Sequence, residues 1–366
     1  MQRTFELKEP RLHVNALAVT RLGTGRVTKG RSVRAAVILA VLIGGCASPN
    51  RQPAVERQGN PVWPPPPEQP RVAYIGALHE PRDIGQSPSL WARAGHWLTG
   101  GTTENLALQK PFGLALDELG NLCITDTAAK RVYYCDFARK HWHHYETAGQ
   151  TRFVSPVAVA RRNGTFYVAD SEFGKVFAFR DDGKLVWSLD APLRRPAGLA
   201  LAGDALGVVD SQAHSVFVFD LQGKLRFQFG KRGVGPGEFN FPTHITTDNH
   251  GHWLVNDAMN CRVQVFDSQG QFVSQFGSNG DTSGHFSRPK GVAVDAFGHV
   301  YVADAVFDNF QIFELTGQFL LNIGETGTGP GQFGLPAGIA IGSDGRIYVA
   351  DSYNHRVQIF KYTGQP

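Results

Sequence analysis

The sequence predicts an all-β protein, a six-bladed β-propeller, because one pattern recurs along residues 71–366. Each copy holds a proline, a short apolar run, a Gly turn and a second strand that ends in Asp. The prolines are Pro111, Pro156, Pro196, Pro242, Pro289 and Pro336, spaced by about 40–47 residues. Such a period, built from short strands and turns, is typical of propeller blades. Runs rich in Val, Ile, Phe and Tyr, bounded by Gly, Asp and Asn, favour strands over helices.

The fifth repeat illustrates how one copy becomes a blade. It contains four apolar runs, separated by turn residues such as Gly298 and Gly317, at 291–295, 299–304, 310–314 and 318–324. Four antiparallel strands that pack between neighbouring blades are buried on both faces. The runs are therefore nearly continuously apolar instead of alternating.

The two ends of the repeat region predict how the ring closes. The sixth repeat stops at Pro366, where the fifth repeat leads into a fourth strand. Residues 71–78 have the same rhythm as the fourth strands at 224–230 and 271–277. We therefore expect residues 71–78 to complete the last blade, which removes an exposed sheet edge.

The best-preserved repeats resemble the NHL-repeat family, here as a bacterial lipoprotein member. Asn354-His355-Arg356 follows a Tyr-Val-Ala-Asp strand, and the loops at 230–242 and 324–336 have that family's Gly-x-Gly-Pro-Gly-x-Phe form. The resemblance covers about residues 71–366. It implies a platform that binds protein, peptide or RNA, although fold alone is a weak guide to function.

An Asp ends the second strand of every repeat, at Asp126, Asp170, Asp210, Asp257, Asp304 and Asp351. A carboxylate placed before a tight loop accepts backbone N–H groups, which explains this recurrence without catalysis. No pair of residues stands out as a general acid and base. We therefore predict no catalytic residue.

The first 45 residues predict export. The apolar run 35–45 follows several Arg and Lys residues and is too short to span a bilayer, as in a signal peptide. Ile43-Gly44-Gly45-Cys46 resembles the bacterial lipobox, so Cys46 is the expected lipidation site, and its lipid the only expected cofactor. An ordinary secretory signal is the alternative. By the same resemblance Ala47 favours the outer membrane, and the over-long N-terminal extension suggests a mis-assigned start.

Removing the signal peptide changes the charge. Residues 1–45 hold eight Lys/Arg and two Asp/Glu, against a whole-chain charge of +4, so the remainder carries about −2. This balance does not predict a nucleic-acid partner. Residues 46–70 are rich in proline and polar residues, and we expect them to form an extended tether behind Cys46.

One segment interrupts the repeat pattern. Leu90, Trp91, Ala94, Trp97 and Leu98 recur at helical spacing, which predicts a short amphipathic helix at about residues 88–100. The helix would cap the propeller or, alternatively, bind a partner.

Cysteine and histidine clusters give two candidate sites in the first repeat. Cys123 and Cys135 lie on consecutive strands, so they are either a disulfide or buried free thiols. His141, His143 and His144 lie on an outer strand, where they would bind a metal or line a wet edge. No metal site is predicted from these spacings, and Cys261 has no evident partner.

The residues around each repeat proline should face the central channel in propellers of this kind. They form a weakly cationic collar with His244, Arg288 and Lys290. Phe307 beside Asp308, in a loop that departs from the family pattern, would suit a protein contact, or it is a locally repacked loop. A metal-dependent lyase or lactonase would need three or four ligands from different blades, and the sequence offers at best His244, one position later than the family pattern places it.

Together these observations predict an outer-membrane lipoprotein that faces the periplasm or the cell surface. Its monomeric propeller would bind an envelope protein or peptide without catalysis, through His244, Arg288, Lys290, Phe307 and Asp308. A metal-dependent lyase or lactonase-like hydrolase is the first alternative. A glycan-binding propeller, suggested by Trp142, Tyr145 and Tyr353, is the second.

Overall fold

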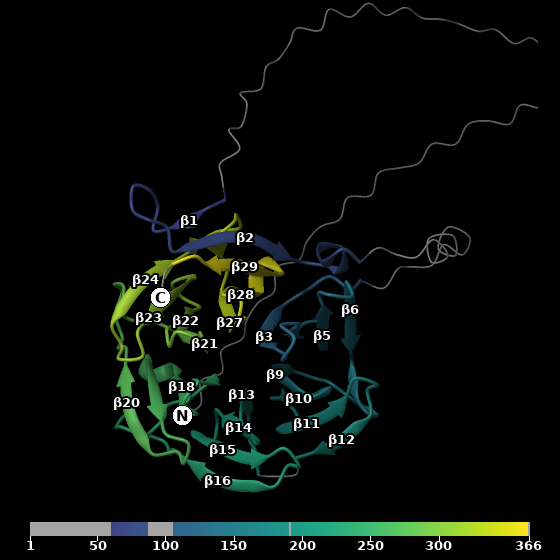
Figure 1. The fold of residues 1–366 in the computed structure, drawn as a ribbon. Coiled ribbons are helices and arrows are strands. Elements are labelled where there is room, and N and C mark those ends of the chain that lie inside the picture. The colour runs from purple at the N-terminus through teal and green to yellow at the C-terminus, as the bar shows by residue number, and fades with distance from the viewer. Residues whose placement is uncertain (1–59, 87–104, 190–191, 365–366) are drawn as a thin grey trace, which may run out of the picture. The chain divides into compact units, whose positions relative to one another are not determined.

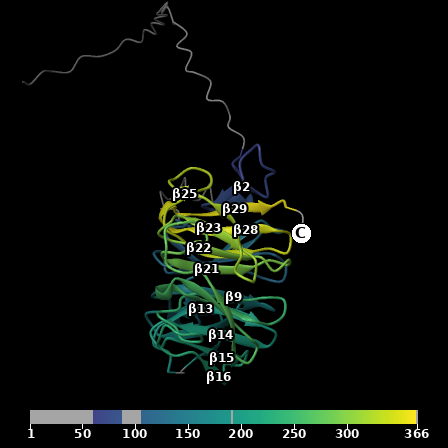
Figure 2. The ribbon, with the colours of Figure 1, turned by 90° about the vertical axis from the view of Figure 1, so that its left-hand side faces the viewer.

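A computed structural model describes residues 60–86, 105–189 and 192–364, and these residues form a ring of six blades (Figure 1). The all-β fold and the blade count predicted from the repeats are confirmed. Cys46, the signal peptide at 1–45 and the helix expected at about 88–100 lie outside the described residues. Seen from the side, the strands run along the axis of the ring, between its two faces (Figure 2).

Blades one to three each contain four antiparallel strands. From the axis outwards, blade one consists of β3 (Pro111–Leu116), β4 (Leu122–Asp126), β5 (Arg131–Asp136) and β6 (His141–Tyr145). Blade two consists of β9 (Pro156–Arg162), β10 (Thr165–Asp170), β11 (Lys175–Arg180) and β12 (Leu185–Ser188). Blade three consists of β13 (Pro196–Ala202), β14 (Ala205–Asp210), β15 (Ser215–Asp220) and β16 (Leu225–Phe229).

Blades four to six repeat this order, and the sixth has an additional strand. Blade four consists of β17 (Ile245–Thr247), β18 (Trp253–Asp257), β19 (Arg262–Phe266) and β20 (Phe272–Phe276). Blade five consists of β21 (Pro289–Val294), β22 (Val300–Asp304), β23 (Asn309–Phe313) and β24 (Phe319–Ile323). Blade six consists of β27 (Pro336–Ile341), β28 (Arg346–Asp351), β29 (Arg356–Tyr362), β2 (Val72–Leu78) and β1 (Val62–Trp63).

Short elements complete the described chain. Two pairs of two-residue strands lie in loops: β7 (Thr147–Ala148) with β8 (Thr151–Arg152), and β25 (Glu325–Thr326) with β26 (Gln332–Phe333). The loops also contain three single-turn 3₁₀ helices, η1 (Pro81–Ile84), η2 (Ala258–Asn260) and η3 (Ser352–Asn354). No helix among these residues is long and apolar enough to cross a membrane.

The sixth blade combines both ends of the repeat region. Strand β2 pairs antiparallel with β29, with Val72 opposite Tyr362 and Leu78 opposite Val357. Strand β1 then adds a fifth strand, and its Trp63 ring lies 5.7 Å from that of Phe360. The prediction of an extended tether up to residue 70 is therefore wrong for residues 61–63, because pairing with β2 and ring packing hold these residues on the blade.

The hydrophobic core of the described residues consists of six clusters, one between each pair of neighbouring blades. The cluster between blades six and one, for example, joins Tyr348 and Val357 to Leu122 and Ile124. Each middle strand is therefore buried on both faces, which accounts for the continuous apolar runs in the sequence. Burial of this kind is the main favourable contribution to folding.

We name the two faces of the ring by their loops. The connector face carries the segments that lead from one blade to the next, such as 105–110, and the loops between second and third strands, such as 127–130. A hydrogen bond from the Thr127 N–H to the Lys110 carbonyl joins these two kinds of loop. The hairpin face carries the loops between first and second strands.

Candidate functional site

The recurrent aspartates are structural. Asp126 is fully buried, and its carboxylate accepts hydrogen bonds from the backbone N–H groups of Gln109, Lys110, Ala128 and Ala129. These bonds tie the segment entering blade one to the loop that follows its second strand. Asp170, Asp210 and Asp304 make the same kinds of bond. The capping role predicted from the sequence is confirmed.

In blades four and six this carboxylate also accepts side-chain donors. Asp351 accepts Arg356 Nε at 2.8 Å and Gln358 Nε2 at 3.0 Å. In blade four Asp257 accepts the matching Arg262 and Gln264. The charge of each buried Asp is thereby neutralised inside its own blade, so these groups are not available to a ligand.

The first strands approach each other so closely at the axis that most blades have glycine there. The residue two after the repeat proline is Gly113, Gly198, Gly291 or Gly338 in four blades. A Cβ on Gly338 would lie 2.4 Å from the Phe112 carbonyl oxygen of the next blade. In these four blades glycine is therefore required by the packing between blades, whereas blade two has Ala158 at this position.

Blade four places His244 at this position, and a group of buried polar atoms surrounds it. Both ring nitrogens of His244, the Thr243 hydroxyl and Asn256 Oδ1 are buried and have no hydrogen-bond partner in the part of the chain that the structure describes. The His244 ring stacks on the Phe112 ring at 5.8 Å. Burial, and secondly the charge of Lys290, lower the pKa of His244 from 6.5 to about 3, so the imidazole is neutral at physiological pH.

Lys290 lies beside this group at the mouth of the channel. Its Nζ is 5.1 Å from the centre of the Phe112 ring, close enough for a cation–π interaction. Burial, and after it the charges of Arg288 and Lys110, lower the pKa of Lys290 from 10.5 to about 8. The ammonium is thus within electrostatic reach of two other cations, and no ion pair neutralises it among the described residues.

Further cations extend this charge over the connector face. Arg194, Arg195 and Arg232 line a cleft of about 500 Å³ together with His214 and Phe241. Six cations in or next to the segments that lead from one blade to the next have no ion pair among the described residues: Lys110, Arg194, Arg195, Arg232, Arg288 and Lys290. We call these six the connector cations.

The connector face also exposes apolar and aromatic side chains. They come from the loops of five different repeats and are between 42 and 58% exposed: Phe173, Phe241, Met259, Val306 and Tyr353. Lys110 Nζ lies 5.1 Å from the centre of the Tyr353 ring. Cations and apolar groups thus share one face, a composition that suits a protein contact.

The structure brings some of the predicted site residues together and places others elsewhere. His244 and Lys290 meet at the channel mouth, with Arg288 beside them. Asp308, in contrast, is buried and accepts hydrogen bonds from the Thr326 hydroxyl and the Leu335 N–H. Phe307 is only partly exposed. The prediction that Phe307 and Asp308 form a partner contact is therefore wrong for Asp308, whose carboxylate is used to hold its own loop.

The candidate disulfide is also corrected. Cys123 and Cys135 are buried free thiols. In the register of β4 and β5, Cys123 lies opposite Tyr134 and Cys135 opposite Leu122. Because residues that face each other across a ladder share one side of the sheet, the two thiols project to opposite sides. Accordingly, they belong to two different hydrophobic clusters.

The outer strand of blade one brings two imidazoles together, as the sequence predicted. The rings of His141 and His143 have centroids 3.9 Å apart. In the described part of the chain, however, no three His, Cys, Asp or Glu side chains gather as a metal-binding group.

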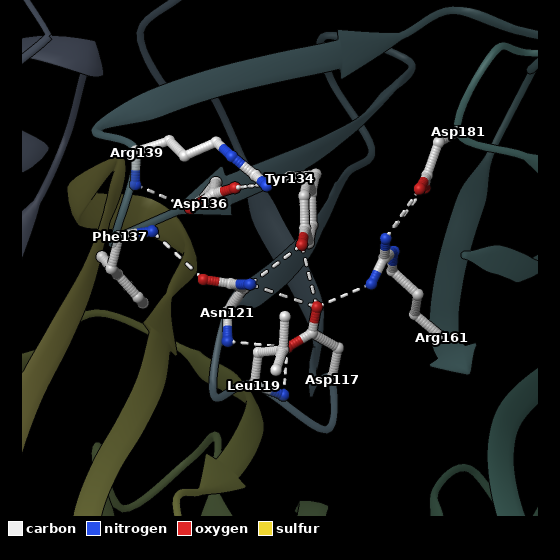
Figure 3. A network of polar contacts seen from close by, with 9 residues as sticks. All are labelled: Asp117, Leu119, Asn121, Tyr134, Asp136, Phe137, Arg139, Arg161 and Asp181. Carbon is white, nitrogen blue, oxygen red and sulfur yellow. Dashed lines mark hydrogen bonds and ion pairs between the residues drawn. The ribbon is translucent and has the colours of Figure 1, made fainter. Parts of the chain in front are cut away.

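The hairpin face holds a polar network that sequence reasoning missed (Figure 3). Arg161 of blade two reaches Asp117 of blade one at 2.6 Å and Asp181 at 2.9 Å. The Asp117 carboxylate also accepts the hydroxyl of Tyr134 at 2.8 Å. Asp117 begins an Asp-x-x-Gly-Asn turn, which signals the turn but not the arginine from the neighbouring blade. This network joins blades one and two.

Arg161 and Asp117 also line the channel where it opens on the hairpin face. There the first strands enclose a cavity of about 370 Å³ that is lined by charged groups and by apolar side chains such as Leu199, Val292 and Ile339. Nearer the connector face the channel narrows to a cavity of about 40 Å³, which His244 and several of the glycines line. The two mouths therefore differ, because one is cationic and the other is lined by the paired charges of Arg161 and Asp117.

Comparison with known proteins agrees with this architecture. The family model described as NHL repeat matches residues 286–315 and 333–360, and one described as 6-bladed beta-propeller matches residues 188–253.

Solved structures of similar fold have low sequence identity. A streptogramin B lyase is 12% identical over 70% of this chain and 95% of its own, with a TM-score of 0.53. Virginiamycin B lyase from Staphylococcus aureus is 16% identical over 69% and 80%, with a TM-score of 0.52. The WD40 propeller domain of Doa1 is 14% identical over 68% and 77%, with a TM-score of 0.50. These likenesses show the fold alone.

Proposed function

Because this chain is a six-bladed β-propeller built from NHL repeats, we propose that it is a non-catalytic platform whose connector face binds an acidic protein or peptide. The observation that carries this proposal is the set of connector cations, none of which has an ion pair among the described residues. The exposed side chains of Phe173, Phe241, Met259, Val306 and Tyr353 supply the apolar contacts of the same surface.

Electrostatics explains why such a face selects an acidic partner. Like charges held near each other raise the local potential, and an acidic segment relieves this repulsion when it binds. Complementary charge mainly increases the association rate and the specificity, whereas each exposed ion pair contributes only about 0–1 kcal/mol. Binding should therefore depend on several cations together and should weaken with added salt.

A labelled oligoglutamate peptide tests this proposal with the full chain. Fluorescence anisotropy compares the wild type with a variant that combines Arg195→Gln, Arg288→Gln and Lys290→Gln. The matched control is Arg226→Gln, because Arg226 is paired with Asp204 on the hairpin face. We expect the triple variant to lose about tenfold or more in affinity, equivalent to ~1.4 kcal/mol.

Two results would contradict this proposal. One is equal binding by the triple variant and the wild type, and the other is an equal loss in the Arg226→Gln control. Near-stoichiometric zinc or calcium in the purified full chain, with ligands at the channel, would instead favour the alternative of a metal-dependent lyase.

The proposal also includes an outer-membrane anchor at Cys46, supported by the lipobox-like Ile43-Gly44-Gly45-Cys46 after an apolar run. Metabolic labelling with an alkyne-bearing fatty acid in a bacterial host tests it. We expect label on the wild-type chain and none on Cys46→Ala, which should leave the membrane fraction. An unlabelled wild-type chain in the soluble fraction would refute the anchor.

A further inference from the structure

We propose that the mouth of the channel receives one carboxylate of the partner, which Lys290 and the buried polar groups of blade four bind. This inference rests on the proposed function, since the acidic partner supplies the carboxylate. It names the point at which that partner enters the ring.

The first argument is the concentration of unsatisfied polar atoms. Buried polar groups in folded proteins are nearly always hydrogen-bonded. Thr243 Oγ1, both nitrogens of His244 and Asn256 Oδ1 nevertheless lack a partner, and all belong to the inner end of blade four. An unpaired buried polar group destabilises the structure that contains it, so a ligand that forms hydrogen bonds with these groups is favoured.

The second argument is the position of Lys290. Asn256 donates a hydrogen bond from Nδ2 to the Lys290 carbonyl, which joins the two blades at this point. The Lys290 ammonium and the His244 ring both lie against the Phe112 ring, at 5.1 and 5.8 Å. A cation without an ion pair therefore lies next to the unsatisfied groups. A carboxylate is the counter-charge that this site lacks.

The third argument is the mixture of donors and acceptors. The ammonium, the Thr243 hydroxyl and one imidazole N–H can donate to a carboxylate, whereas Asn256 Oδ1 and the second imidazole nitrogen can only accept. A ligand that carries an amide N–H beside its carboxylate satisfies both kinds. The C-terminal residue of a peptide has this arrangement.

The shape of the channel limits how far the ligand can enter. Beyond the mouth, the glycines of the first strands narrow the channel to about 40 Å³. That space holds one or two water molecules and excludes a continuing chain. The site therefore accepts an end group, either a chain terminus or the tip of an Asp or Glu side chain.

Small probes distinguish these sources. The histidines of the full chain are isotopically labelled, and the His244 ring resonances are identified by their absence in His244→Gly. Four probes are titrated separately: N-acetyl-L-alanine, its amide, N-acetyl-L-aspartate with an amidated α-carboxyl group, and inorganic phosphate. We expect saturable shifts of His244 with a carboxylate probe and none with the alanine amide, and about a tenfold loss of affinity in Lys290→Met. Arg226→Met is the control and should bind as the wild type does.

Stronger binding of N-acetyl-L-alanine assigns the site to a chain terminus, and stronger binding of the aspartate derivative assigns it to an acidic side chain. Equal binding of the alanine amide, equal or tighter binding of phosphate, or unchanged affinity in Lys290→Met would each overturn the inference. So would the absence of any shift, since the unsatisfied atoms would then hold only buried water.

The oligoglutamate measurement separates the two levels of the proposal. If the triple variant still loses affinity for oligoglutamate while no probe moves His244, the platform stands and the carboxylate site is wrong. If oligoglutamate binding does not depend on the connector cations, the proposed function itself fails.

Discussion

Acid should destabilise this propeller through one buried side chain, His244. In the folded chain its pKa is lowered from 6.5 to about 3, first by burial and then by Lys290. Between about pH 3 and 6.5 the His244 side chain is therefore protonated in the unfolded chain and neutral in the folded chain. Above pH 6.5 His244 is neutral in both states and does not reduce the free energy of unfolding. As the pH falls from 6.5 towards 3, its protonation in the unfolded chain reduces that free energy progressively.

The magnitude follows from the size of the shift. Each pH unit below 6.5 favours the protonated unfolded chain by about 1.4 kcal/mol until the folded pKa is reached. At about pH 4.5, two units lower, the histidine should therefore reduce the free energy of unfolding by roughly 3 kcal/mol. That loss is a large part of the stability of an ordinary domain.

Comparing two chains at two pH values separates the effect of His244 on stability from the titration of other groups. His244→Gly introduces the residue found at this position in four other blades, and both chains are unfolded with urea at about pH 7.5 and pH 4.5, monitored by tryptophan fluorescence. Between about pH 7.5 and pH 4.5, the free energy of unfolding of the wild type should fall by roughly 3 kcal/mol more than that of His244→Gly. His250→Gly, which removes an exposed histidine, should behave as the wild type does. If the wild type and His244→Gly lose equal stability, the reasoning is refuted.

Three further predictions concern other residues. Oligoglutamate affinity should fall as the pH rises through about 8, because Lys290 loses its proton there; anisotropy measured from pH 6.5 to 9.5 checks this, and a flat profile contradicts it. Gly338→Val should destabilise the ring by about 2 kcal/mol or more, because its Cβ would meet the Phe112 carbonyl oxygen at 2.4 Å; an unchanged melting temperature would show that the strands can separate. Asp351→Asn should cost about 3–5 kcal/mol because Arg356 is left with a buried, uncompensated charge; urea unfolding measures the loss, and a cost below 1 kcal/mol would contradict it.

The repeat period was sufficient to predict the blades. Each strand and turn is encoded within about ten consecutive residues, by apolar runs and by Gly or Asp at the turns. The aspartates at the strand ends were understood from the sequence for the same reason, since Asp126 accepts from Ala128 and Ala129 close by in the chain. Local chemistry of this kind does not depend on the neighbouring blades.

The candidate site could be predicted only in part. Lys290, Arg288 and His244 were chosen because residues near the repeat proline face the channel in propellers of this kind. The glycine alignment that makes His244 unusual is also visible in the sequence, but the loss of hydrogen-bond partners around it is not. The Asp308 prediction was wrong because the sequence shows a carboxylate in a loop without showing that Thr326 and the Leu335 N–H occupy it.

The sequence by itself determined the fold class, the number of blades and the order of their strands, because these depend on a pattern that repeats along the chain. Only the tertiary structure decided which groups meet. Arg161 pairs with Asp117, 44 positions away, and Cys123 and Cys135 lie on opposite sides of their sheet. The physical reason is that contacts between blades depend on register, side-chain direction and close packing around the axis, and none of these is expressed in the local pattern of either partner.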